Sequence, residues 1–335
     1  MEIDVAFLGD NSPGWAPVTH LGHLAARLLG GRTLNLSARP SRVEKLLNLQ
    51  RRRVGPSNET LLAILRSPAE FAILRAMPEF RSEYRQIAVW VIDSFQHDWI
   101  PSAASLRDLD LIAVTRPNDV SIFSRKAPGR VFVLSWGSDV LDMGSGTEIR
   151  EVDVLRIGRQ PPEWDDDNLS KVICSNARLR FAGRPPLLSD PARNQMAIMA
   201  ALAGTRFTIA HSNLAAPAPY THRSEEYITA RWTDALACGA IVAGIQPRGD
   251  ESMDNLLWPG AVLDFDRIDL AHNVAALAEA AKGWSALDAV NNYRKALMQL
   301  DWRLRLLELV DRLGVDTPPK LASDIARLKV AASLN

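Results

Sequence analysis

Cysteine is nearly absent from this chain of 335 residues, which contains only Cys174 and Cys238. Two isolated cysteines cannot form a disulfide framework, and they cannot supply the ligand set of a structural zinc site. Cys238 lies in a run of small residues, where it is expected to be a buried thiol. This usage excludes the small disulfide-stapled secreted proteins and fits a reducing compartment.

A net charge is also lacking, because 39 basic side chains are balanced by 39 acidic ones. No global positive field therefore exists to attract nucleic acid or an anionic membrane, and no nucleic-acid reading motif is present. The basic run at 51–53 is the best candidate for a local patch, although such runs are usually solvated helix faces. We expect no nucleic-acid partner, whereas a peripheral membrane contact stays open.

Long hydrophobic runs are missing as well. No apolar stretch approaches the roughly 20 residues that a membrane-spanning helix requires. The first four residues are acidic and apolar, and they lack the basic segment and long apolar core of a secretory signal. The sequence therefore predicts a cytoplasmic protein.

What the chain does contain is an alternation of short apolar strands and helical segments. Its length of 335 residues suits two domains. A Gly/Ser-rich stretch near 136–152 predicts a hinge, so that the domains span 1–145 and 146–335. Residues 41–85 are expected to be mostly helical, and the chain ends in helices at about 269–282, 285–313 and 319–333. Strands are expected at 3–9, 32–37, 87–93, 109–115, 131–134, 152–158, 207–210, 240–243 and 261–265.

Apolar runs separated by helices are typical of parallel sheets that are covered on both faces. The sequence thus predicts an α/β fold with two halves that face each other across a hinge. Parallel sheets place ligands at the carboxyl ends of their strands. In the first half, four polar residues stand just past such ends: Asp10, Asp93, Thr115 and Ser135.

The segment 225–244 carries the strongest chemical signal. Ser224 is the expected N-cap of a helix that Gly239 would end, and an apolar strand follows. Glu226 and Asp234 are separated by seven residues on this expected helix. Carboxylates accept hydrogen bonds from sugar hydroxyls, and a helix N-terminus can hold a diphosphate. The alternative is that Glu226 only caps the helix and that Asp234 lies on a solvated face.

This segment resembles the Glu-x7-Glu element of retaining GT-B glycosyltransferases, with Asp234 in place of the second Glu. The whole chain resembles that class, and its C-terminal half is most similar to the glycosyltransferase family four and spore-maturation-type branch. The resemblance implies a GT-B-like fold of two Rossmann-like domains facing across a cleft. Further matching segments occur in the same order at 90–95, 111–115, 134–139, 153–159 and 234–239.

The resemblance also implies roles for the matching acids. Glu226 would accept hydrogen bonds from hydroxyls of the donor sugar and take part in catalysis. Asp234 would accept hydrogen bonds from the ribose hydroxyls of the nucleotide.

A positively charged clamp for the diphosphate is implied in the same way. Arg159 would approach the diphosphate, and Gly158 would let the backbone come close. The class often adds a Lys, which this chain does not show at a matching position, so Arg231 or Arg223 is expected to substitute. His222, in the loop before the expected helix, is a further candidate to contact donor oxygens. The alternative for Arg159 is an exposed residue at a strand end.

In the first half, many members of the class carry a His where this chain has Asp93. Asp93 is expected to orient the acceptor hydroxyl or take its proton, and the alternative is a strand-end Asp that caps the next turn. His97 is expected to be a partly exposed structural histidine. His20, near the start of the first helix, is expected to contact the acceptor. His20 and His23 could pair on a metal, but no third ligand is evident, so no metal and no cofactor are expected.

The function that the resemblance implies is transfer of a sugar from a nucleotide sugar to an acceptor hydroxyl, with retention of configuration and without a metal. A nucleotide-sugar epimerase and a non-catalytic nucleotide- or carbohydrate-binding protein remain as alternatives. The acceptor is open among a glycan, a lipid-linked sugar and a small molecule, and the protein is expected to be a monomer or a homodimer. Base selection is expected in loops near Arg184 and Asn213. The acidic run 165–167 is expected to be solvated at a helix start.

Overall fold

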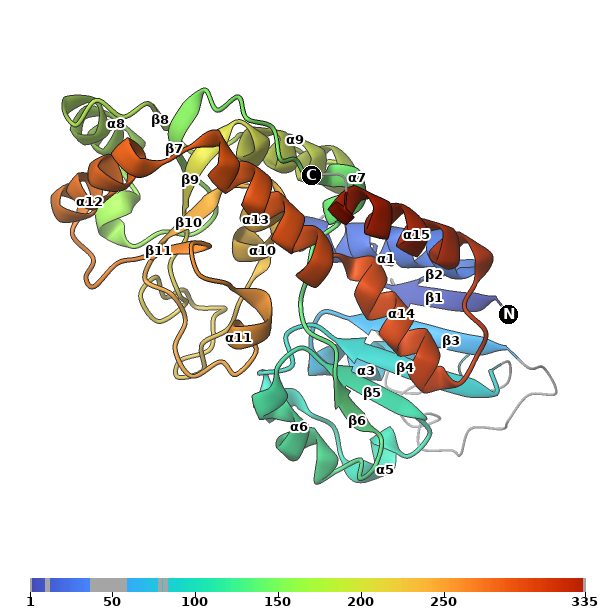
Figure 1. Ribbon diagram of the computed structural model, residues 1–335. Helices are drawn as coiled ribbons and strands as arrows, with labels where there is room; N and C mark the ends of the chain where they lie inside the picture. Colours follow the sequence, from blue (N-terminus) through green and yellow to red (C-terminus); the bar gives the residue numbers. More distant parts are fainter. Residues whose placement is uncertain (1, 10–12, 37–58, 78–79, 81–83, 334–335) are drawn as a thin grey trace. The chain divides into compact units, whose positions relative to one another are not determined.

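The chain folds into two compact units, each of which is described by itself. The computed structural model describes residues 2–9, 13–36, 59–77, 80 and 84–333 (Figure 1). The first unit consists of Met1–Ser135, Ser189–Ala192 and Arg303–Ile325, and the second consists of Trp136–Leu188, Arg193–Trp302 and Ala326–Asn335. The first crossing between the units thus falls at 135/136, whereas the sequence predicted a boundary at 145/146. Part of the C-terminal helical segment, 303–325, belongs to the first unit, which the sequence did not indicate.

The first unit is built on a six-stranded sheet with the order β2-β1-β3-β4-β5-β6. Every neighbouring pair is parallel. The strands are β1 (Ile3–Phe7), β2 (Gly30–Asn35), β3 (Thr60–Leu65), β4 (Gln86–Val91), β5 (Leu111–Val114) and β6 (Val131–Val133).

Helical elements connect these strands, as parallel pairing requires, except between β2 and β3, whose connection lies largely outside the described residues. The described helical elements of this unit between β1 and β6 are η1 (Pro13–Trp15), α1 (Ala16–Leu29), η2 (Pro68–Glu70), α3 (Phe71–Leu74), η3 (His97–Trp99), α5 (Ala103–Leu106) and α6 (Pro117–Ser124).

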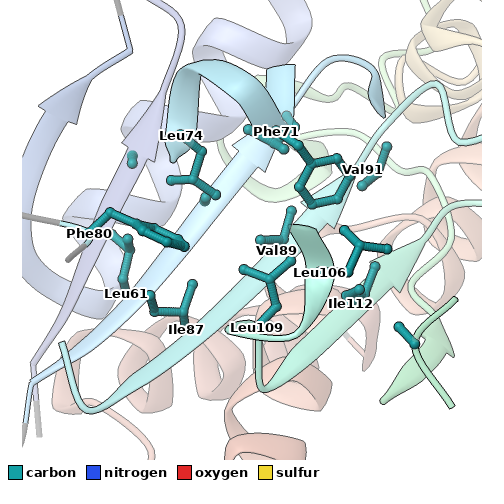
Figure 2. Close-up of a cluster of buried hydrophobic side chains, with 14 of the residues drawn as sticks. Leu61, Phe71, Leu74, Phe80, Ile87, Val89, Val91, Leu106, Leu109 and Ile112 are labelled. Atoms are coloured by element: carbon teal, nitrogen blue, oxygen red, sulfur yellow. The ribbon is translucent and has the colours of Figure 1, made fainter. Parts of the chain in front are cut away.

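The core of the first unit lies on the faces of its central strands. All six residues of β3 are buried, because strands covered on both faces can be apolar throughout. Figure 2 shows part of this core, where side chains from β3, β4 and β5 gather with those of α3 and α5: Leu61, Phe71, Leu74, Ile87, Val89, Val91, Leu106 and Ile112.

The prediction of helix across 41–85 is wrong for residues 60–65, which form β3. β3 pairs with β1 on one side and with β4 on the other. A short apolar run can form either a buried strand or part of a buried helix, and here its pairing on both edges decides the outcome. Residues 41–58 lie outside the described residues, as do Asp10 and the basic run at 51–53.

The second unit contains a five-stranded sheet with the order β11-β10-β9-β7-β8, and its pairs are also parallel. Its core joins side chains of β7, β9 and β10 to those of α8 and α12, among them Val154, Cys174, Phe207 and Leu277. The strands are β7 (Val152–Arg156), β8 (Phe181–Ala182), β9 (Thr205–Ile209), β10 (Ile241–Gly244) and β11 (Val262–Asp264).

Along the chain, helices precede, separate and follow the strands of this unit. Asp166 caps α8 by accepting from the backbone N–H groups of Asn168 and Leu169 at 2.8 and 3.0 Å. The helix therefore starts at Asp167, as expected. The helical elements are α7 (Val140–Met143), η4 (Pro162–Trp164), α8 (Asp167–Asn176), α9 (Pro191–Ala203), α10 (Ala230–Ala237), α11 (Met253–Leu256), α12 (Leu270–Gly283) and α13 (Ala286–Gln299).

The long helix expected at 285–313 is divided into α13 and α14 (Trp302–Leu313). The break falls at Leu300–Asp301, where the backbone pairs with Ser138 instead of continuing the helix. Ser138 donates to the carbonyl of Leu300 at 2.9 Å, and Trp302 donates to the carbonyl of Ser138 at 3.0 Å. A backbone bridge of this kind uses groups that a continuous helix would need for itself.

The segment 303–325 packs within the first unit through α14 and the start of α15 (Pro319–Ser333). Arg305 donates to the carbonyl of Ser135 at 3.1 Å, and Gln86 donates to the carbonyl of Leu313 at 3.2 Å. None of the helices in the described part of the chain has the length and apolar character that a membrane crossing requires.

Candidate functional site

The carboxyl edge of the second sheet gathers the loops that follow β7, β9 and β10. Gln160 donates to the carbonyls of Ile157 and Ile209, both at 2.9 Å, and so joins the ends of β7 and β9. The backbone of Ser212 donates to the carbonyl of Ile245 at 2.8 Å, which joins the ends of β9 and β10. This edge is where a parallel sheet places its ligand.

Arg231, in the first turn of α10, ties two of these loops together. Its guanidinium donates to the carbonyl of Arg159 at 2.8 Å and to the carbonyl of His211 at 3.0 Å. Gly158 has a φ of 63°, and a Cβ at this position would lie 2.6 Å from Cδ of Arg231. Glycine is therefore required here both by the backbone conformation and by the close approach of the arginine.

Arg159 carries hydrogen-bond donors that nothing in the described structure uses. Its Nε and Nη2 atoms are buried and have no hydrogen-bond partner. Its Cζ atom lies 5.7 Å from the ring centroid of Tyr220. Unused donors on a buried guanidinium are costly unless a ligand or a water molecule accepts from them.

The two arginines also have no counter-charge within the described part of the chain. Among the described residues neither Arg159 nor Arg231 forms an ion pair, whereas nearby Arg156 contacts Asp165 and Asp167 at 3.1 and 2.6 Å. Burial, followed by the charge of Arg159, lowers the pKa of Arg231 to about 10. Arg231 therefore remains positive at neutral pH, and the site presents two adjacent guanidinium groups. The acidic run is consequently not simply solvated, because two of its members hold Arg156.

The start of α10 adds further donors to the site. Thr229 is the N-cap, but its side chain makes no capping hydrogen bond, and its hydroxyl oxygen is buried without a partner in the described structure. The first turn of a helix has unpaired backbone N–H groups and the positive end of the helix dipole. Together with the two arginines these donors suit a phosphorylated ligand.

Glu226 lies at the same sheet edge, but it is not on a helix. Its Oε1 accepts from the hydroxyl of Ser212 at 2.5 Å, and its Oε2 accepts from the backbone of Arg248 at 2.7 Å. The prediction of a helix starting at Ser224 is wrong, because α10 begins at Ala230. The preceding segment contacts a distant loop instead, since Asp250 accepts from the backbone of Ile228 at 3.2 Å.

Asp234 is on α10 but faces the protein interior, with an exposure of 2%. Its Oδ1 accepts from the hydroxyl of Ser138 at 2.6 Å, and its Oδ2 accepts from the amide of Gln195 at 2.9 Å. The alternative of a solvated face is therefore wrong. Gly239, one residue past the helix C-cap, has the expected left-handed conformation with a φ of 76°.

The loop before α10 contains the other two candidates for donor contacts. The Nδ1 atom of His222 accepts from the backbone of Glu225 at 2.9 Å, so this ring organises its own loop. Arg223 is exposed to solvent. The structure thus joins Gly158, Arg159 and Arg231 by direct contacts and leaves Arg223 on the surface.

His211 is a member of the site that the sequence did not indicate. Its Nδ1 accepts from the backbone of Ile245 at 3.1 Å, while its Nε2 is buried and unpaired in the described structure. Burial, followed by the charge of Arg231, lowers the pKa of His211 to about 3. The ring is therefore neutral and carries its proton on Nε2. In the sequence, only its position just after the strand β9 could have indicated that His211 belongs to the site.

In the first unit Asp93 follows β4 and is partly buried. Burial and the nearby charge of Glu70 raise the pKa of Asp93 to about 7. Glu70 itself is fixed by Arg66, whose backbone and Nε donate to it at 2.8 and 2.7 Å. A carboxyl group that titrates near neutral pH suits proton transfer at physiological pH.

The described contacts of the histidines of the first unit are with protein side chains. His97 contacts the buried carboxylate of Asp119 at 2.7 Å, and Ser94 donates to the same carboxylate at 2.6 Å. Burial, followed by the charge of His20, lowers the pKa of His23, so these two residues of α1 are close to each other. The described residues contain no group of three or more side chains that could hold a metal ion.

Comparisons with known proteins support the fold. No family model matches the chain, and no curated protein matches it. The structure is similar to that of HepE from Anabaena, solved with UDP-glucose, with 11% identity, a TM-score of 0.53, and coverage of 93% of this chain and 100% of that chain. It is also similar to sucrose-phosphate synthase from Thermosynechococcus elongatus, with 11% identity, a TM-score of 0.54, and coverage of 93% and 98%.

At this level of identity the similarity establishes the fold alone. The two parallel sheets and the two solved structures confirm the expected α/β fold of GT-B type, with two Rossmann-like domains. The assignment to the family-four and spore-maturation branch stays a prediction.

Proposed function

We propose that the protein is a glycosyltransferase that moves a sugar from a nucleoside-diphosphate sugar to an acceptor hydroxyl. The observation that carries this proposal is the pair of adjacent arginines, Arg159 and Arg231, which have no acidic partner among the described residues at the ligand-binding edge of the second sheet. A diphosphate would supply both the missing charge and the missing hydrogen-bond acceptors. The similarity of fold to HepE, which was solved with UDP-glucose, supports the same choice of ligand.

The chemistry follows from where charge develops. When the bond between the sugar and the diphosphate breaks, negative charge grows on the leaving phosphate. Two fixed guanidinium groups and the N-terminus of α10 stabilise that charge without reorganising. We therefore propose Gly158, Arg159 and Arg231 as diphosphate-binding residues and a reaction that needs no metal.

Glu226 is the proposed contact to the donor sugar. Each of its carboxylate oxygens accepts one hydrogen bond from the protein, and each has capacity for one more. Hydroxyl groups of a sugar would use that capacity. Asp234 is buried and accepts on both oxygens from side chains of the protein interior, so we propose that it contributes to donor binding mainly by holding α10 in place. His222 contributes in the same indirect way, and Arg223 is left as a surface contact to donor oxygens.

On the acceptor side we propose Asp93 as the group that orients the acceptor hydroxyl and takes its proton, with His20 as a further contact. Its pKa of about 7 lets Asp93 accept a proton near neutral pH. Retention of the sugar's configuration is part of the proposal. An NMR spectrum of the product that showed inverted stereochemistry at the transferred carbon would contradict that part alone.

The first test is a calorimetric titration with uridine, guanosine, adenosine and thymidine diphosphates and their sugars. We expect one of these nucleotides to bind, and we expect Arg159→Ala and Arg231→Ala each to weaken it at least about tenfold, since charged hydrogen bonds are lost. Arg267→Ala is the matched control, because Arg267 is exposed and pairs with Asp266 at 2.6 Å away from the described contacts of the site. Absence of binding by every nucleotide would refute the proposal.

A second assay follows the donor once it is known. Incubation with candidate acceptors should yield a new glycoside together with the free nucleoside diphosphate. Conversion of the donor alone into an isomer would indicate an epimerase instead. Tight binding without turnover over a broad acceptor panel would indicate a binding protein.

A further inference from the structure

Tyr220 is unusually exposed for an aromatic side chain, and yet its ring lies near the guanidinium of Arg159, whose Nε and Nη2 atoms have no hydrogen-bond partner in the described structure. Its exposure is 72%, and its ring lies 5.7 Å from Cζ of Arg159. Its hydroxyl makes no hydrogen bond with the described residues. The contact to a guanidinium is therefore the main interaction that the ring has.

The backbone on both sides of Tyr220 is fixed, whereas the ring itself is not. Thr221 and Ala218 form a turn in which the Thr221 hydroxyl donates to the Ala218 carbonyl at 2.9 Å. Asn213 donates to the carbonyls of His222 and Glu225 at 3.0 and 2.8 Å. A rotation about the Cα–Cβ bond of Tyr220 can consequently move the ring without unfolding the loop.

The covered face of Arg159 is the one that a ligand would need. Its Nε and Nη2 atoms are buried and unpaired in the described structure, so a phosphate oxygen cannot reach them until something moves. The neighbouring Arg231 is held in place, because its guanidinium donates to the carbonyls of Arg159 and His211. Among the described contacts of Arg159, the exposed ring of Tyr220 is the one that can leave at little cost.

We propose that Tyr220 controls access to Arg159, and that its ring must turn away before a phosphate group can bind to the Nε and Nη2 atoms. This inference rests on the proposed function for its ligand. The ring and the phosphate compete for one guanidinium. Charge-assisted hydrogen bonds are stronger than an exposed contact between a cation and a ring, so the phosphate displaces the ring.

This competition predicts that removal of the ring strengthens binding. Tyr220→Ala should tighten binding of the nucleoside diphosphate identified above by about two- to fivefold, which is what an exposed ring contact contributes. Tyr220→Phe retains the ring and should bind as the unmodified protein does. Leu214→Ala is the matched control for the loop, because Leu214 is also exposed, at 43%. Weaker binding by Tyr220→Ala would overturn the proposal, since the ring would then be a contact to the ligand.

A second readout does not depend on the nucleotide. Phenylglyoxal modifies accessible arginines, and mass spectrometry of peptides reports the rate at each position. Arg159 should react several times faster in Tyr220→Ala than in the unmodified protein, Tyr220→Phe or Leu214→Ala, while exposed Arg267 reacts equally in all four. Equal rates at Arg159 in Tyr220→Ala and the unmodified protein would overturn the proposal. If no nucleotide binds to any variant, the proposed function fails, and the labelling rates still decide whether Tyr220 covers Arg159.

Discussion

The hydroxyl of Ser138 donates a 2.6 Å hydrogen bond to Oδ1 of Asp234, although 96 positions separate the two residues in the sequence. With the amide of Gln195 on Oδ2, this contact satisfies both oxygens of a buried carboxylate. It fixes the helix whose first turn carries Arg231. Asp234 thus supports the proposed anion site indirectly, through buried hydrogen bonds that hold α10 in place.

Asp234→Ala should lower the free energy of unfolding by about 2–4 kcal/mol, because it leaves Ser138 and Gln195 with unpaired buried groups. Urea denaturation monitored by circular dichroism measures the change. Asp311→Ala, at an exposed position on α14, is the control and should change stability by less than about 0.5 kcal/mol. A loss at Asp234 no larger than at Asp311 would show that the buried bonds contribute nothing.

Gly158→Ala should weaken binding of a nucleoside diphosphate at least about tenfold, because the new methyl group would displace Arg231 from the carbonyls that it holds. Gly260→Ala is the matched control. Gly260 has a similar positive φ of 89°, but no atom lies within 4 Å of its added Cβ. Both variants bear the backbone strain, and only Gly158→Ala should lose affinity in calorimetry. Equal affinities would separate Gly158 from the site.

The pH dependence of stability reports on Asp93. Its pKa is raised from 3.8 in the unfolded chain to about 7 in the folded protein, so folding favours the neutral acid. This contribution is fully present below pH 4 and is lost as the pH rises through 7, by up to about 4 kcal/mol. Asp93→Asn removes the titration. Denaturation at pH 5 and pH 8 should therefore show a larger fall in stability for the unmodified protein than for the variant. Parallel profiles would contradict the raised pKa.

Asp324→Asn tests the buried ion pair within the first unit. The Arg303 side chain is fully buried, and its Nε lies 2.9 Å from Oδ2 of Asp324. Removing the carboxylate charge should cost about 3 kcal/mol, because the guanidinium then lacks a negative charge that compensated its burial. A double variant, Arg303→Met with Asp324→Leu, should be less destabilised than Asp324→Asn in the same denaturation experiment. The opposite order would mean that the attraction outweighs the cost of burying both charges.

The sequence predicted most of the strands because each is a short apolar run between helices, as in β1, β4 and β7. It misassigned β3, whose leucines are compatible with a buried helix until the pairing on both edges is known. It did not anticipate β8, which has only two residues. It also joined α13 to α14, because the helical periodicity continues through a break where the backbone pairs with the distant Ser138.

For the candidate site, the sequence indicated residues through local patterns and spacing. The structure adds their contacts with residues that are distant in the sequence. Gly158, Arg159 and Arg231 were identified and are in contact. Glu226 was placed on a helix because Ser224 and the acids are typical of a helix start, whereas that segment forms tertiary hydrogen bonds and the helix begins only at Ala230. His211 and Tyr220 are part of the site because they contact Arg231 and Arg159, which come from other segments of the chain. No local sequence pattern reveals such contacts.

Two adjacent guanidinium groups, Arg159 and Arg231, that have no acidic partner among the described residues should make the ligand-free protein less stable than the protein with a bound anion. Inorganic phosphate, sulfate or pyrophosphate in the buffer should therefore raise the melting temperature in a manner that chloride cannot match at equal ionic strength. A preparation from cells should also be expected to carry phosphorylated metabolites until they are dialysed away.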